Sequence, residues 1–166
     1  MIDRIVRAIR LDWTVFGEIA QDREAMKEAA IIVAIVSFLS AVGSGIANAS
    51  FASFIVAWIV AILVGWIGWA VITYFVGTAL FQGETDIPEM MRVLGYANAP
   101  HLLGLFSFIP CVGWIFAVAG WILSLAAGVL AIREAMDFDT GNAIVTVVLS
   151  WIIAIGVRAV FWFLIG

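Results

Sequence analysis

Long apolar runs alternate with short polar segments along this chain. Apolar residues fill 29–47, 51–81, 93–109, 114–133 and 142–164 with few interruptions. An α-helix rises about 1.5 Å per residue and the hydrocarbon core of a bilayer is about 30 Å thick, so runs of about 20 residues can cross it. The run 51–81 is longer and must tilt or project beyond the headgroups. The pattern predicts an all-α, polytopic membrane helical bundle with five transmembrane helices.

The boundary between the third and fourth runs decides the number of spans. Pro110 and Gly113 can form a minimal turn between two helices. The alternative is one long span over residues 101–132, which reduces the count to four.

A short amphipathic segment precedes the first run. Its apolar residues fall on one stripe at 100° per residue: Ile2, Ile5, Val6, Ile9, Trp13 and Phe16. Arg4, Arg7 and Arg10 lie elsewhere on the same helix, as is typical of helices that lie in the headgroup layer. We therefore expect 1–27 to be a cytoplasmic amphipathic segment, with Ile5, Ile9, Trp13 and Phe16 at the membrane surface, and 28–166 to form the transmembrane domain. In the alternative, the segment packs on the protein's own cytoplasmic face.

Polar residues at the ends of the runs predict helix caps. Asp22 can cap the first transmembrane helix. Asp86, followed by Pro88, predicts the start of the third helix. Asp137 or Asp139 can cap the last helix.

The composition excludes most site chemistry. Hydrophobic residues make up 65% of the chain and charged residues only 12%, which is more apolar surface than a water-soluble domain of this size can bury. The single cysteine, Cys111, excludes an internal disulfide or a multi-thiolate metal site. The single histidine, His101, excludes paired-imidazole sites. We expect no metal and no cofactor.

The charges indicate the orientation. With five spans, every basic side chain except Arg158 and all twelve acidic side chains fall on the side of the N-terminus. The excess of Lys and Arg places that side in the cytoplasm. Because acidic groups outnumber basic ones there, the field opposes nucleic-acid binding.

The segment 91–101 is the one place where polar residues and a proline interrupt an apolar run. Pro100 should kink its helix and leave a carbonyl near Tyr96 without a donor, and Asn98 lies within reach of that carbonyl. The short hairpin should also bring Arg92 to the depth of residues 133–137, so we predict that Arg92 pairs with Glu134 or Asp137.

Eight tryptophans are many for this length. Some fit boundary anchors, but four should lie inside the hydrocarbon: Trp66, Trp69, Trp121 and Trp151. They either pack against sister helices or face a large apolar body such as a neighbouring subunit, a quinone or a pigment. His101 is either hydrogen-bonded within the bundle or a ligand of a metal-bearing macrocycle.

Small residues recur four positions apart in several runs, which favours close helix packing within the bundle or, alternatively, a dimer interface. The pairs are Ser40 and Ser44, Ala61 and Gly65, Gly113 and Ala117, Ser124 and Gly128, and Ser150 and Ala154. No nucleophile motif, zinc-protease motif or phosphate-binding glycine loop occurs, so no catalytic residues are predicted and an enzyme is not expected.

Several motifs together resemble the Yip family (Ypt-interacting protein) in its short prokaryotic form. They are the segment 92–100 with Arg92, Gly95, Tyr96, Asn98 and Pro100, the break at Pro110 followed by Gly113-Trp114, the segment 131–143 with Arg133, Glu134 and Asp137, and Trp13-Thr14-Val15-Phe16 followed by Glu18 and Asp22. The resemblance implies five spans and a cytoplasmic N-terminus. In eukaryotic relatives it would imply vesicle trafficking, contact with small Rab-type GTPases and the shaping of curved membranes.

Three functions are compatible with these features. The first is a non-enzymatic membrane scaffold that binds the lipid bilayer and other membrane subunits or a second copy of itself. The second is a small accessory subunit of a respiratory or photosynthetic membrane complex, motivated by the buried tryptophans. The third is a carrier or channel at the Pro100 kink with Asn98 and His101.

Overall fold

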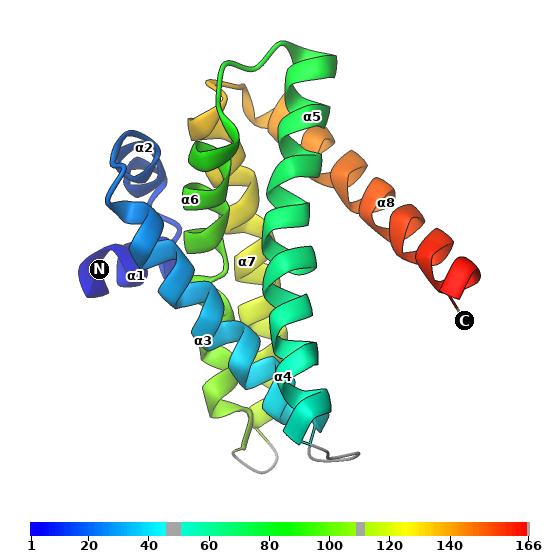
Figure 1. Ribbon diagram of the computed structural model, residues 1–166. Coiled ribbons are helices and arrows are strands. Elements are labelled where there is room, and N and C mark those ends of the chain that lie inside the picture. The colour runs from blue at the N-terminus through cyan, green and yellow to red at the C-terminus, as the bar shows by residue number, and fades with distance from the viewer. Residues whose placement is uncertain (46–50, 109–111, 166) are drawn as a thin grey trace.

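A computed structural model describes residues 1–45, 51–108 and 112–165, and throughout these ranges the chain forms helices joined by turns, without a strand (Figure 1). The helices in chain order are α1 (Ile2–Ile9), α2 (Trp13–Gln21), α3 (Ala25–Gly45), α4 (Phe51–Val60), the π-helix η1 (Ala61–Gly68), α5 (Trp69–Phe81), α6 (Ile87–Ala97), the 3-10 helix η2 (Ala99–Phe108), α7 (Gly113–Ala135) and α8 (Thr140–Ile165). The predicted all-α class is confirmed.

Four helical stretches in the described residues are long and apolar enough to cross a membrane. They are Ala25–Val42, the continuous helix Phe51–Phe81, Gly113–Ala135 and Thr140–Val157. The chain is therefore a multi-pass membrane protein. The remaining predicted span, 93–109, falls mainly on α6 and η2, and neither helix alone has the length to cross. The count of five thus stays a prediction, but one continuous span over 101–132 is wrong, because η2 packs alongside α7.

The leading segment is two helices instead of one. The chain turns at Leu11, whose φ of 59° is left-handed, and α2 then starts with Asp12 accepting a hydrogen bond from the Thr14 N–H at 3.1 Å. Arg7 adds a contact of 2.8 Å from its Nε to the same carboxylate. The single stripe from Ile2 to Phe16 is therefore wrong, because a local aspartate cap overrides the apolar periodicity.

Three predicted caps are confirmed. Asp86 accepts from the Glu89 N–H at 2.6 Å with Pro88 in the first turn of α6. Asp139, not Asp137, accepts from the Gly141 N–H at 3.0 Å at the start of α8. Asp22 accepts from the Glu24 N–H at 3.0 Å before α3.

α6 and α7 form the centre of the bundle, between α3 and the α4–η1–α5 helix (Figure 1). The buried core gathers where α2, α3, α6 and α7 meet, around Phe16, Ile19, Ile32, Val93 and Ile132. α8 contacts α5 and α7 near its start and then diverges from the bundle (Figure 1). The outward sides of α4, α7 and α8 expose large apolar side chains, as expected for helices whose solvent is lipid.

Candidate functional site

Arg92 joins α6 to the end of α2. Its side chain is buried, and it donates from Nε to the Ile19 carbonyl at 3.3 Å and from Nη2 to the Ala20 carbonyl. Carbonyls in the last turn of a helix lack intrahelical donors and form the negative end of the helix dipole. The guanidinium therefore caps α2, and the predicted pairing of Arg92 with Glu134 or Asp137 is wrong.

Arg133, not Arg92, forms the ion pair with Glu134. Its Nε and Nη2 donate to Glu134 Oε1 at 3.0 and 2.8 Å. The Arg133 guanidinium also lies 5.5 Å from the centre of the Trp13 ring, a cation–π distance that fixes the start of α2 against the end of α7. Asp137 has a left-handed φ of 52°, and the Phe138 N–H returns to the Arg133 carbonyl at 2.9 Å. Asp137 thus follows the end of α7, and it forms no ion pair with any of the described residues.

Tyr96 ties α6 to the N-terminal helices. Its ring is fully buried and its hydroxyl donates to the Glu28 carboxylate. Arg4 lies 3.7 Å from that carboxylate and 2.7 Å from Asp22. Sequence reasoning missed this contact, because nothing in the local pattern pairs Glu28 with a residue 68 positions away.

The predicted membrane-surface residues divide between two environments. Trp13 is 52% exposed, Ile5 and Ile9 are half-buried against the core, and Phe16 has no exposed surface. For Phe16 the prediction is wrong, because α2 packs its ring into the bundle.

The break at Asn98–Pro100 is a change of helix type. α6 ends at Ala97, and η2 continues from Ala99 as a 3-10 helix, so the predicted kinked α-helix is wrong. The Asn98 side chain donates to the Leu94 carbonyl at 2.8 Å, and the Ser124 hydroxyl of α7 donates to the Ala97 carbonyl at 2.7 Å. Two carbonyls freed near Pro100 are thus satisfied by side chains, as a low-dielectric medium requires. Asn98 was predicted to reach a carbonyl left without a donor near Tyr96. Its side chain does donate to such a carbonyl, which belongs to Leu94. Pro110 lies outside the described residues.

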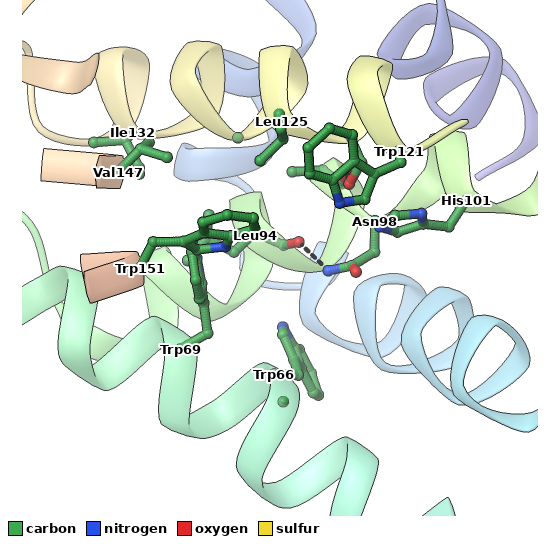
Figure 2. Close-up of a pocket in the computed structure, with 14 residues that line it drawn as sticks. Trp66, Trp69, Leu94, Asn98, His101, Trp121, Leu125, Ile132, Val147 and Trp151 are labelled. Atoms are coloured by element: carbon green, nitrogen blue, oxygen red, sulfur yellow. Dashed lines mark hydrogen bonds between the residues drawn. The ribbon is translucent and has the colours of Figure 1, made fainter. Parts of the chain in front are cut away.

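A cavity of about 250 Å³ lies beside this break. Its wall comes from the α4–η1–α5 helix, the α6–η2 junction, α7 and α8: Gly65, Trp66, Trp69, Leu94, Ala97, Asn98, His101, Trp121, Ser124, Leu125, Gly128, Ile132, Val147 and Trp151. Figure 2 shows the four tryptophan rings turned toward one space, with Asn98 and His101 near Trp121. The tryptophans that sequence reasoning placed inside the hydrocarbon therefore converge from three separate helical segments.

Two glycines leave part of this cavity open. A Cβ added at Gly65 or Gly128 would meet no atom within 4 Å. The pairs that contain these glycines were predicted to allow close packing of helices within the bundle. That prediction is wrong at Gly65 and Gly128. Gly95 and Gly120 do allow close approach, since a Cβ there would lie 2.6 Å from Ala29 Cβ and 2.8 Å from the Pro100 carbonyl oxygen.

A family model described as the Yip1 domain matches residues 14–161. The chain belongs to the Yip1 domain family. No curated protein and no solved structure matches it. The match covers the Asn98 break and every residue of the cavity wall, so the cavity is part of the Yip1 domain itself.

The polar atoms of the cavity in this Yip1 domain are mostly unused donors. Trp66 Nε1 donates to the Met91 carbonyl at 2.9 Å. Within the described residues, the indole N–H groups of Trp69, Trp121 and Trp151 and the His101 ring make no hydrogen bond. The lining contains no charged side chain. No cluster of three metal-ligating side chains occurs in the described part of the chain.

An apolar groove of about 360 Å³ continues from the cavity between α7 and α8. It is lined by Leu125, Ala126, Val129, Ile144, Val147, Val148, Trp151 and Ile152. Leu125, Val147 and Trp151 belong to both walls. Ile144, Val148 and Ile152 are exposed on the outer side of α8, so the groove opens toward the surrounding lipid.

Proposed function

We propose that this Yip1-domain protein is a non-enzymatic membrane scaffold whose last helix binds a transmembrane helix of a neighbouring subunit. The observation that carries the proposal is the exposure of α8 beyond Ser150. Trp151, Ile152, Ile153, Ile155 and Val157 are between 40% and 60% exposed. At 100° per residue these positions span about two thirds of the circumference of the helix. Trp151 contacts Trp121 of α7, with ring centres 6.1 Å apart, and beyond it most of the apolar surface of α8 is not covered by the described bundle.

Gly156 makes this part of α8 suited to helix association. A Cβ at Gly156 would meet no atom within 4 Å. Lipid tails compete equally for apolar contact, so association of transmembrane helices depends on close backbone approach at small residues. α8 diverges from its own bundle and carries a glycine that contacts no other helix of that bundle. Close contact with a helix of another subunit therefore accounts for these features better than contact with lipid alone.

A second candidate function is an accessory subunit of a respiratory or photosynthetic complex, favoured by the tryptophan cavity. In either role we place the segment 1–27 and both polar loops, 82–89 and 134–141, on the cytoplasmic side, with 28–166 as the five-span domain. In the five-span arrangement every basic residue except Arg158 lies on that side, and this difference between the two sides supports the orientation.

Photo-crosslinking from α8 tests the scaffold role. A photoreactive residue at Ile155 should give a defined protein product in native membranes, whereas one at Val118, which is 46% exposed on α7, should give mainly lipid products. Gly156→Leu should reduce the Ile155 product several-fold by blocking close approach, and Gly128→Leu should leave it unchanged. The mass of the product separates a second copy from a different subunit, and the identity of that subunit tests the accessory role. A strictly monomeric protein that crosslinks only to lipid from Ile155 would contradict the proposal.

A further inference from the structure

We propose that the tryptophan cavity and the adjoining groove bind one neutral lipid that has a planar ring with carbonyl oxygens and a long apolar tail, which is the chemistry of an isoprenoid quinone. The ring occupies the cavity and the tail leaves through the groove into the bilayer. Gly156 lines neither the cavity nor the groove, so the proposal goes beyond the scaffold role.

The donors of the cavity select the head of the ligand. An indole nitrogen can only donate, and three of the four tryptophans have an unused N–H. Asn98 has a second amide N–H besides the one given to Leu94. The ligand should therefore present acceptors. It should also be uncharged, since the lining offers neither a cation for a phosphate nor a carboxylate for an ammonium group.

The shape of the cavity selects a flat ring. Four indole rings supply planar apolar walls, and the open positions at Gly65 and Gly128 leave space between helices that side chains would otherwise fill. Sites for whole small molecules measure about 300–1,000 Å³. A cavity of about 250 Å³ thus holds a substituted ring but not a ring with its tail.

The groove supplies the place for the tail. It shares Leu125, Val147 and Trp151 with the cavity, so the two spaces adjoin without an intervening layer of side chains. All eight of its lining residues are apolar, and it opens beside Ile144, Val148 and Ile152 on the lipid side. A head with acceptors in the cavity and a hydrocarbon chain in the groove therefore satisfies both surfaces.

The irregular backbone around the cavity has the same explanation. η1 is a π-helix over Ala61–Gly68, and the α6–η2 junction at Asn98 is a change to a 3-10 helix. Single π-helical turns occur frequently at functional sites, and irregular backbone at membrane depth is tolerated where it lines a cavity. Both irregular segments contribute residues to this one wall.

Quinone binding to the purified protein tests the proposal. Decyl-ubiquinone, a short-tailed benzoquinone, should quench the tryptophan fluorescence of the protein in nanodiscs saturably. Gly128→Leu should weaken binding at least tenfold by filling the cavity, and it should fold, because its Cβ meets no atom within 4 Å. Gly156→Leu adds the same side chain outside the cavity and should leave the affinity within twofold of the original protein. Quenching that does not saturate, or equal affinity in the two variants, would overturn the proposal.

A second variant tests the donor chemistry, with binding read by equilibrium dialysis because the tryptophan itself is changed. Trp121→Phe keeps an aromatic ring but removes the N–H, and should weaken binding by about two- to tenfold, the value of one neutral hydrogen bond. 1-Decanol, which has the same decyl tail and no carbonyl ring, should not displace the quinone. Displacement by the alcohol, or by a phospholipid, would show that the cavity does not recognise the ring and would overturn the assignment. Loss of quinone binding with an intact Ile155 crosslink separates this site from the scaffold role.

Discussion

At the scale of single residues, Arg92 shows how a correctly chosen side chain can have the wrong partner. Sequence reasoning selected it because the short hairpin should bring it to the depth of Glu134 and Asp137. Its acceptors are the Ile19 and Ala20 carbonyls, more than 70 positions earlier in the chain. Backbone carbonyls exist at every residue, so no sequence pattern marks these two as acceptors.

Replacement of Arg92 should therefore loosen the contact between α2 and α6. Arg92→Gln keeps a donor but cannot reach both carbonyls, and we expect a loss of about 2 kcal/mol of stability, the range for hydrogen bonds to a charged group. Thermal unfolding in detergent measures it. The matched control is Arg23→Gln, on an exposed side chain, which should have little effect. Equal unfolding midpoints for the two variants would contradict the capping role.

At the scale of elements, the N-terminal helices are held by ion pairs at the surface as well as by buried Phe16. Arg7 lies 2.8 Å from Asp12 and from Glu18, and Arg4 lies 2.7 Å from Asp22. Hydrogen bonds from Thr14 and then Arg7 lower the pKa of Asp12. The Arg7 hydrogen bond lowers the pKa of Glu18, and the Arg4 hydrogen bond lowers that of Asp22.

Acid should therefore release α1 from the bundle. A carboxyl whose pKa is lower in the folded state stabilises that state above its unfolded value, about 3.9 for Asp and 4.3 for Glu, and this stabilisation is lost as the pH falls through the folded pKa. Hydrogen exchange of residues 2–21, corrected for intrinsic rates, should be constant around neutral pH and should rise below about pH 4. The combined variant Asp12→Asn, Glu18→Gln and Asp22→Asn should exchange fast already at neutral pH. Unchanged protection in acid would rule out a structural role for these pairs.

The contact of α3 with α6 depends on Gly95. A methyl group there would lie 2.6 Å from Ala29 Cβ, so Gly95→Ala must separate the two helices, and overpacking of this kind costs about 1–3 kcal/mol. Gly128→Ala is the matched control, because its Cβ meets no atom within 4 Å and alanine stabilises a helix by about 0.5–1 kcal/mol over glycine. The two unfolding midpoints should move in opposite directions. A shift of the same sign in both would contradict the close approach at Gly95.

At the scale of the whole molecule, the two polar loops lie at one end of the bundle (Figure 1). The Phe81 and Phe138 rings are 5.8 Å apart, and a Cβ at Gly83 would lie 2.7 Å from the Phe138 ring. This neighbourhood requires an even number of membrane crossings between the loops, as α6–η2 and α7 provide in the five-span arrangement.

Cysteine labelling tests that arrangement. In a Cys111→Ser background, Glu84→Cys and Thr140→Cys place one thiol in each loop region, and both positions are exposed. With the orientation proposed above from the basic residues, a membrane-impermeant maleimide should label neither in intact cells and both in inverted vesicles. Labelling of the two thiols from opposite sides would exclude the five-span threading.

The sequence alone determined the medium and the local geometry. Lipid offers no hydrogen bonds, so a spanning stretch must satisfy its own backbone, and a continuous apolar run of about 20 residues does so as a helix. The apolar runs therefore predicted the helical class and most helix boundaries. Asp86 and Asp139 cap from side chain to nearby backbone, which is also a local relation. Tertiary structure alone decided which distant groups meet. The acceptors of Arg92, the partner of Tyr96 and the meeting of Trp66, Trp69, Trp121 and Trp151 at one cavity depend on how helices are rotated and placed against one another. A membrane helix that is apolar on all sides has no polar face to fix its rotation. A small residue such as Gly128 can lie either at a close contact between helices or beside a cavity, and the sequence does not distinguish the two.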